Sequence, residues 1–291
     1  MSPPRVSIAI PTWNGAGFVG ETLSTALHQT FADLEVLVVD DASEDGTLEV
    51  VAAAHDPRIR VLPGARRLGI PGNWNRCLAE ARGEYVKLLC QDDLLAPTAV
   101  ERLVSALDAA PGSPLAFSRR EIRHEGFEAP LPLLGDTYPR ALERFYASFA
   151  GRVSGLQIVS DALASGQDPT VNLVGEPSFV LMRRDALRAC GGFDAGLRQL
   201  VDWDLWLRLA RLGPLAFVDE SLGVFRVHPR GASAANNRSL RTRWEFLVIL
   251  SRMRRDYGPD LGAEGRRRLR REEWRCRRHL LGGILGPSSS S

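Results

Sequence analysis

The chain has 291 residues, of which 44% are hydrophobic and 25% are charged, and its formal net charge is +2. This composition excludes a disordered chain and predicts a globular protein with a core of useful size. No apolar run approaches the length of about 20 residues that spans a bilayer. The N-terminal apolar stretch is too short for a secretory signal. The sequence contains no CxxC motif, which argues against a zinc site. We therefore expect a cytoplasmic protein.

Strand-like and helical patterns alternate through the first 110 residues. We expect strands at 5–10, 34–39, 58–62 and 84–89, and helices at 17–30, 46–55, 71–82 and 98–109. The expected strands are continuously apolar, which is typical of a parallel sheet covered by helices on both faces. The sequence thus predicts an α/β fold with a Rossmann-like, mostly parallel sheet flanked by helices.

The rest of the chain is less regular. Further helices are expected at about 139–150, 183–190 and 202–212, and further strands at 177–182, 215–219 and 222–228. The pattern from 240 to 280 predicts two arginine-rich helices, broken near Gly258 and Pro259. The tail at 286–291 is expected to be disordered.

Three polar clusters follow expected strands, namely PTWN at 11–14, DDAS at 40–43 and QDD at 91–93. Ligands of open α/β sheets bind beyond the carboxyl ends of the strands, so these clusters predict one site. No GxGxxG motif follows the first strand, and a nicotinamide or flavin cofactor is therefore not expected.

The adjacent carboxylates Asp92 and Asp93 come directly after a buried-looking strand. Such a pair suits a divalent cation that bridges phosphate oxygens, and the cation would offset the repulsion between the two like charges. A turn or a helix cap is the structural alternative for two neighbouring aspartates.

Two later residues have both a structural and a functional interpretation. Asp202 falls in the first turn of an amphipathic helix, where the helix dipole favours an anion, and an N-terminal capping role would explain it equally well. His228 ends a strand before Pro229, where it is either a ligand or an ordinary surface or core histidine.

Five motifs in order resemble family 2 glycosyltransferases of the GT-A fold: IAIPTWN, VVDDASEDGT, ARGEYVKLLCQDDLLAP, GGFD with VDWDLWLRLA, and FRVHPRGAS. The resemblance covers residues 5–233 and weakens beyond about residue 236. It implies a GT-A domain, a helical extension and a tail. The expected bounds are 1–235 for the domain (1–110 the nucleotide-sugar binding half, 111–235 the acceptor-side half), 236–285 for the arginine-rich extension, and 286–291 for the tail.

The resemblance also implies a set of residues that bind the nucleotide sugar: Pro11, Thr12, Trp13, Asp41, Asn75 and Asp92. Asp41, rather than Asp40, is expected to contact the base, and Trp13 stands where the family usually has a tyrosine. Asp92 is expected to face the ribose or the sugar. Glu176 belongs to a segment that resembles a loop near the acceptor, without a fixed role.

A divalent cation, Mn²⁺ or Mg²⁺, is implied as the cofactor. Its expected ligand is Asp93, the last residue of a QDD that replaces the commoner DxD, and His228 matches a histidine that completes the metal or diphosphate site in some members. Asp202 matches the catalytic base of an ED-type motif, although Val201 stands where the family often has an acid.

The implied reaction moves a sugar from a nucleotide diphosphate sugar to an acceptor hydroxyl with inversion at the anomeric carbon. UDP is the family's commonest nucleotide, with dTDP and GDP open, and the acceptor is a glycan, a lipid-linked sugar or a small molecule. Asp202 would take the proton of the attacking hydroxyl. A nucleotidyltransferase and an inactive sugar-nucleotide binding protein are the alternatives, although the glycine-rich, lysine-bearing loop of the former is absent.

The segment from 236 to 280 carries 14 arginines against six acidic residues. Three interpretations remain open: a solvated or homodimer face, a platform for anionic lipid head groups, and a grip on an anionic acceptor. Nucleic acid is not expected, because no aromatic interleaving or binding motif accompanies the arginines. The lipid interpretation would place the protein at the inner face of the membrane.

Overall fold

The computed structural model describes residues 3–126, 137–149, 151–164, 172–231 and 240–285. Its strands are β1 (Val6–Thr12), β2 (Leu34–Asp40), β3 (Ile59–Leu62), β4 (Tyr85–Leu88), β5 (Leu94–Leu95), β6 (Leu115–His124), β7 (Arg152–Val153), β8 (Val180–Arg183) and β9 (Leu215–Val227). Its helices are α1 (Val19–Leu27), α2 (Thr47–Ala52), α3 (Ile70–Glu80), α4 (Ala99–Asp108), α5 (Thr137–Tyr146), α6 (Gly155–Ala164), α7 (Arg184–Cys190), α8 (Val201–Leu209), α10 (Leu240–Asp256) and α11 (Ala263–Leu285), with a 3-10 turn, η1 (Pro177–Phe179).

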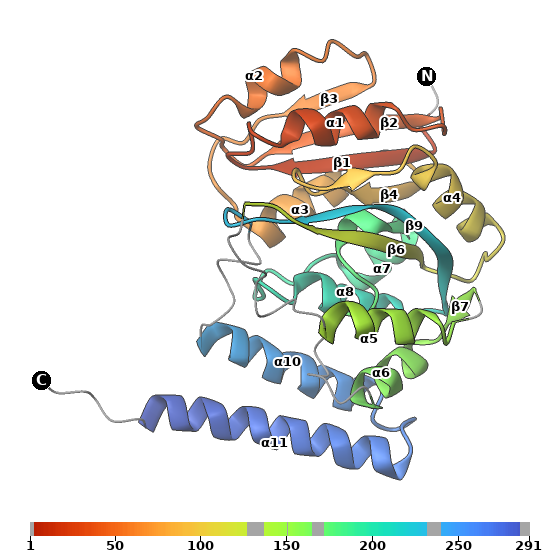
Figure 1. Cartoon of the computed structure of the whole chain (residues 1–291), viewed down its shortest axis with the longest axis vertical. Helices are drawn as coiled ribbons and strands as arrows, with labels where there is room; N and C mark the ends of the chain where they lie inside the picture. The colour runs from red at the N-terminus through yellow and green to blue at the C-terminus, as the bar shows by residue number, and fades with distance from the viewer. Residues whose placement is uncertain (1–2, 127–136, 150, 165–171, 232–239, 286–291) are drawn as a thin grey trace, which may run out of the picture.

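Within these segments, nine strands form one sheet in the order β3-β2-β1-β4-β8-β6-β9-β5, and β7 pairs with β9. The N-terminal half is parallel throughout, because β1 pairs in parallel with both β2 and β4, and β2 with β3. Helices flank the sheet, as Figure 1 shows. The predicted alternation of four strands and four helices in residues 1–110 is confirmed, and the structure adds one short strand, β5, between β4 and α4.

The continuously apolar strands follow from burial on both faces of the sheet. Along β1, Ile8 and Ile10 pack into one core cluster, whereas Ala9 between them joins a second cluster with Leu37 and Val39 of β2. Successive side chains of a strand point to opposite faces, so both faces of this half must be apolar.

The second half of the sheet is mixed in direction. Strand β8 pairs antiparallel with β4 and β6, while β6 runs parallel to β9. The mostly parallel sheet that we predicted is therefore found in the N-terminal half. The two strands expected at 215–219 and 222–228 form a single strand, β9, whose register with β6 shifts near Arg119 instead of breaking.

Strand β6 and helix α6 lie in the region that the sequence left irregular. Only the first four residues of β6 are buried and its last residues are exposed, so the strand lacks a sustained apolar pattern. The Gly- and Pro-rich surroundings gave no clear boundary for either element.

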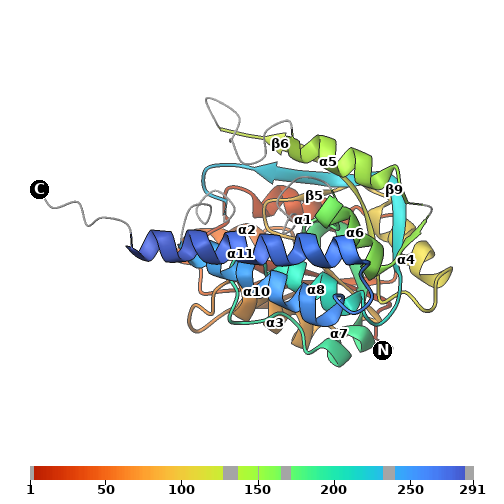
Figure 2. The ribbon, with the colours of Figure 1, turned by 90° about the horizontal axis from the view of Figure 1, so that it is seen from below.

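The C-terminal helices pack onto the α/β domain beside α8, on the side of the molecule opposite β3 (Figures 1 and 2). Helix α10 contributes Ile249, Leu250, Met253 and the following Tyr257 to the larger core cluster. The Tyr257 hydroxyl donates to the Leu207 carbonyl of α8 at 2.6 Å. The predicted break is confirmed, because α10 ends at Asp256 and α11 starts at Ala263. The tail at 286–291 lies outside the described residues, and the domain bounds remain predictions.

None of the helices in the described segments combines the length and apolar character that a bilayer crossing requires.

We predict that α10 contributes strongly to stability through its buried face. Met253→Ala removes a fully buried side chain and should lower the free energy of unfolding by about 2–5 kcal/mol in urea denaturation. Leu247→Ala, on a half-buried position of the same helix, is the control and should cost clearly less. Equal losses in both variants would show that α10 is not packed into the core.

Candidate active site

The carboxyl ends of β1, β2 and β4 meet at one edge of the sheet, because neighbouring parallel strands end on the same side. Two hydrogen bonds join the loops after β1 and β4: Trp13 N donates to Gln91 Oε1 at 2.9 Å, and Gln91 Nε2 donates to the Trp13 carbonyl at 3.1 Å. The ring of Trp13 is 39% exposed, and the guanidinium carbon of Arg67 lies 3.3 Å from its centroid. An aromatic ring and a cation thus border this edge.

The last residue of β2, Asp40, and the following Asp41 both accept hydrogen bonds from other parts of the protein. Asp40 accepts hydrogen bonds from the Thr12 hydroxyl at 2.9 Å and from Ser43 N at 2.8 Å. Asp41 accepts from Leu68 N at 2.6 Å and from Gly69 N at 2.8 Å, which fixes the loop that enters α3. The role of Asp41 at the base of a nucleotide remains a prediction.

Asn75 fastens the turn after α7. Its Nδ2 donates to the Phe193 carbonyl and its Oδ1 accepts from Phe193 N, both at 2.8 Å. Gly192 has a φ of +73°, and a Cβ there would lie 2.6 Å from Asn75 Oδ1, so only glycine fits this approach. The predicted position of Asn75 in a donor pocket stays untested.

Asp92 and Asp93 differ sharply in their surroundings. Asp93 is 1% exposed, and its two oxygens accept from the Ser178 hydroxyl at 2.5 Å and from Arg226 N at 3.1 Å. The Asp92 side chain is 23% exposed, and its Oδ2 lies 3.1 Å from His228 Nε2. Asp92 is therefore the outward-facing member of the pair, and Asp93 holds β9 and η1 in place.

Lys87 lies fully buried on the strand that leads to this pair. Its Nζ donates to the Ser178 carbonyl at 2.6 Å, and burial lowers its pKa to about 7, against the charge of Asp93. Burial, followed by the charge of Asp92, raises the pKa of Asp93 well above its usual value. No motif of the sequence assigned a role to Lys87, although it is the chain's only lysine and lies inside an apolar strand, which was a usable signal.

His228 is held against the site by aromatic and polar neighbours. Its ring stacks on Phe18 at 4.3 Å and is 6% exposed, and its Nδ1 has no hydrogen-bond partner within the described residues. Arg226, also missed, donates to the Asp92 carbonyl and to Glu21. Strand β9 thus brings both residues to the end of β4.

Asp202 occupies the first turn of α8, on the same side of the sheet as the loop with Asn172. Its Oδ2 accepts from Asn172 Nδ2 at 2.9 Å, and its Oδ1 accepts from Trp203 N at 2.7 Å. Burial, followed by the charge of Glu176, raises the pKa of Asp202 to about 7. A carboxylate with this pKa is suited to accept a proton near neutral pH.

Glu176 connects the two groups of carboxylates electrostatically. Its charge raises the pKa of Asp93 as well as that of Asp202, and it forms an ion pair of 2.6 Å with the fully buried Arg120. The sequence analysis gave Glu176 no role. Asp92, Asp93, Glu176 and Asp202 therefore form one cluster of interacting negative charges.

The cluster does not form a complete metal cage. Within the part of the chain that the structure describes, no three His, Cys, Asp or Glu side chains are placed to hold an ion together. Asp92 and His228 form a facing pair of possible ligands, one oxygen and one nitrogen. Mg²⁺ and similar ions often take only one or two carboxylates and complete their shell with water and substrate phosphates.

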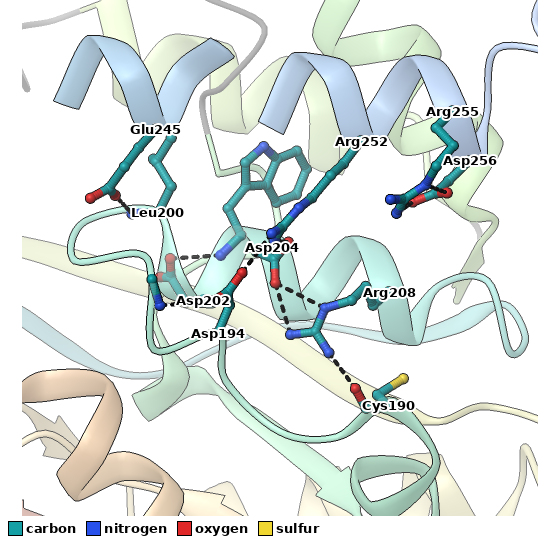
Figure 3. A network of polar contacts seen from close by, with 12 residues as sticks. Cys190, Asp194, Leu200, Asp202, Asp204, Arg208, Glu245, Arg252, Arg255 and Asp256 are labelled. Carbon is teal, nitrogen blue, oxygen red and sulfur yellow. Dashed lines mark hydrogen bonds and ion pairs between the residues drawn. The ribbon is translucent and has the colours of Figure 1, made fainter. Parts of the chain in front are cut away.

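Helix α10 fixes the loop that precedes Asp202 (Figure 3). Glu245, 1% exposed, accepts hydrogen bonds from three consecutive backbone N–H groups, those of Arg198, Gln199 and Leu200, at 2.9, 2.8 and 3.1 Å. Helix α8 therefore starts at a position that α10 determines.

A second set of contacts between α10 and this region lies about two turns further along α10. Arg252 of α10 bridges Asp194, at 2.5 Å, and the buried Asp204 of α8. Asp204 also pairs with Arg208 at 2.8 Å, and Arg208 in turn donates to the Cys190 carbonyl at 2.6 Å. These contacts join α7, α8 and α10 behind Asp202 (Figure 3).

Comparison with known sequences matches a protein family to the segment that contains most of these site residues. Residues 7–191 match the model described as glycosyl transferase family 2. An uncharacterized protein of Mycobacterium tuberculosis is 31% identical over 84% of this chain and 73% of its own length. The succinoglycan biosynthesis protein ExoO of Rhizobium meliloti is 34% identical, and the match covers 41% of this chain and 34% of ExoO.

Solved structures share the fold at low sequence identity. TarS of S. aureus in complex with UDP-GlcNAc superposes with a TM-score of 0.69 at 18% identity, over 98% of this chain and 76% of TarS. The mannosyltransferase PcManGT of Pyrobaculum calidifontis, in complex with GDP-Man and Mn²⁺, gives a TM-score of 0.64 at 21% identity, over 99% of this chain and 77% of PcManGT.

We predict that Glu245→Gln impairs turnover, because Glu245 holds the loop that precedes Asp202. Exchanging a charged acceptor of three N–H groups for a neutral one should lower the free energy of unfolding by about 1–3 kcal/mol. It should also reduce kcat roughly 10- to 100-fold with little change in KM for the donor, because Asp202 is displaced. Glu272→Gln on α11 is the control; a Glu245→Gln enzyme with unchanged kcat would contradict the role.

Proposed function

Because this chain belongs to glycosyl transferase family 2, we propose that it moves a sugar from a nucleotide diphosphate sugar to an acceptor hydroxyl, with inversion and with Asp202 as the base. The GT-A fold predicted from the sequence is confirmed by its likeness to TarS and PcManGT, and the chain is a glycosyltransferase. The observation that carries the proposal is the half-buried carboxylate of Asp202, with its raised pKa, which shares the neighbouring charge of Glu176 with Asp93.

The donor side of the proposal places the nucleotide at the edge formed by β1, β2 and β4. Trp13, with Arg67 stacked on it, offers an aromatic and cationic border for a base and a phosphate. TarS was solved with UDP-GlcNAc and PcManGT with GDP-Man. A UDP-sugar is proposed as the donor here, and dTDP- and GDP-sugars are the competitors to test.

A divalent cation, Mn²⁺ or Mg²⁺, is proposed to sit between the protein and the donor diphosphate, where it would neutralise the leaving group. The residues proposed to hold it are Asp92 and His228, whose facing oxygen and nitrogen fit a shared cation. The family resemblance assigns this role to Asp93, but both oxygens of Asp93 accept hydrogen bonds from the protein. Asp93 is instead proposed to support the turn that presents Asp92.

On the acceptor side, Asp202 is proposed to receive the proton of the attacking hydroxyl. Asn172 and Trp203 N each bond one of its oxygens, which fixes the plane of the carboxylate. Correct placement of acceptor and base supplies much of the rate advantage when the base is weak. The acceptor is proposed to be a hydroxyl compound: a glycan, a lipid-linked sugar or a small molecule.

We predict an acidic limb in the pH dependence of kcat/KM, with an apparent pKa near 7. Asp202 must be ionised to accept a proton, so the rate should rise as pH increases through the pKa of about 7 and level off above it. Glu176→Gln removes a neighbouring negative charge and should move this limb to lower pH. If the acidic limb of Glu176→Gln stays at the same pH as that of the unchanged enzyme, the electrostatic coupling between Glu176 and Asp202 is contradicted.

We predict that Asp202→Asn loses about 10²- to 10⁴-fold in kcat while its KM for the donor is nearly unchanged. The change keeps the size of the side chain and removes its ability to take a proton. Asp219→Asn, on a well-exposed aspartate, is the control and should retain full rate. Full turnover in Asp202→Asn would exclude Asp202 as the base. Tight donor binding without turnover in the unchanged protein would indicate a sugar-nucleotide binding protein instead of an enzyme.

We predict that the metal requirement depends on Asp92 more than on Asp93. Asp92→Asn and His228→Gln should each weaken Mn²⁺ affinity about 10- to 100-fold, measured as the Mn²⁺ concentration at which UDP raises the melting temperature. Asp93→Asn should mainly lower the melting temperature without ligands, because its carboxylate is buried. The opposite pattern would restore Asp93 as the ligand, and full activity in EDTA would exclude a metal.

A further inference from the structure

The outer face of α11 concentrates positive charge at one end of the molecule. Residues 263–279 contain eight arginines against three glutamates. Seven of the arginines are exposed: Arg266, Arg267, Arg270, Arg271, Arg275, Arg277 and Arg278. Glu273 is buried against α10, where it pairs with Arg254. The exposed face of α11 therefore carries these seven arginines against the exposed Glu264 and the half-buried Glu272.

An exposed tryptophan lies within this basic face. Trp274 is 56% exposed, and the guanidinium carbon of Arg278 lies 4.7 Å from the centroid of its ring. Leu269 and Glu273, which are buried, are on the opposite side of the helix, toward α10 and α6. Trp274 belongs to neither of the two hydrophobic core clusters of the described residues.

The position of α11 makes this face accessible. The helix is the outermost layer beyond α10, and in Figure 2 it lies in front of α10 and α8 across the molecule. The exposed arginines run from Arg266 to Arg278, about 18 Å along the helix axis. The arginines thus form an extended strip rather than a pocket for a single small anion.

We propose that the outer face of α11 docks the protein on a membrane surface of anionic lipids. Long, flexible arginines suit phosphate head groups, and a tryptophan ring partitions into the boundary between head groups and acyl chains. A continuous basic strip on a straight helix matches a flat anionic layer. The proposal rests on α11 alone and does not depend on the assignment of Asp202 or of the donor.

The test measures sedimentation of the full chain with vesicles of phosphatidylcholine that contain phosphatidylglycerol, and with vesicles of phosphatidylcholine alone. Binding is expected only to the anionic vesicles and is expected to weaken as salt concentration rises. The triple variant Arg270→Glu, Arg271→Glu, Arg277→Glu should bind at least about 100-fold more weakly, at about fivefold per arginine lost. Trp274→Ala should weaken binding at every salt concentration.

A matched triple variant separates position from net charge. Arg82→Glu, Arg102→Glu, Arg188→Glu reverses three exposed arginines elsewhere on the surface and should keep vesicle binding within a fewfold of the unchanged chain. Circular dichroism and melting temperature confirm that both triple variants are folded. The proposal would be overturned if both triple variants lost vesicle binding equally, or if the unchanged chain did not bind anionic vesicles. It would also be overturned if the unchanged chain formed a stable dimer that only the α11 triple variant dissociated.

Discussion

The burial of carboxyl groups near other carboxylates is the constraint on which this site depends. Burial first, and then a neighbouring charge, raises the pKa of Asp93, beside Asp92 and Glu176, and the pKa of Asp202, beside Glu176. The protein offsets part of this charge with buried cationic side chains, Lys87, Arg120 and Arg226, each of which belongs to a strand of the sheet. The remaining negative charge faces outward at Asp92, where a cation and a diphosphate are proposed to meet it.

The C-terminal helices, outside the matched segment 7–191, are part of the same machinery. Glu245 sets the start of α8, and Arg252 ties α8 to the preceding loop through Asp204 and Asp194. Helix α10 therefore acts on the position of Asp202, while α11 behind it presents the basic face proposed to dock on lipids. The arginine-rich segment thus divides into one helix that supports the site and one that faces outward.

The sequence predicted the parallel half of the fold because its strands are buried on both faces and their polar ends lie at one edge. It could not predict β6, because most of that strand is exposed, or the reversal of direction at β8, because chain direction leaves no local pattern. It identified Asp92, Asp93 and Asp202 as candidates. The proposed division of roles between Asp92 and Asp93 depends on the contacts of Asp93 with Ser178 and Arg226, which are 85 and 133 residues away in the chain, and no local pattern records them.

The most direct test of the proposed mechanism is the anomeric configuration of the first sugar released from a UDP-α-sugar. Slow hydrolysis by water in the absence of an acceptor uses the same face of the sugar and needs no knowledge of the acceptor. Proton NMR at early times should show the β-anomer before mutarotation, and Asp202→Asn should abolish its release. Initial release of the α-anomer would contradict the inverting mechanism with Asp202 as the base.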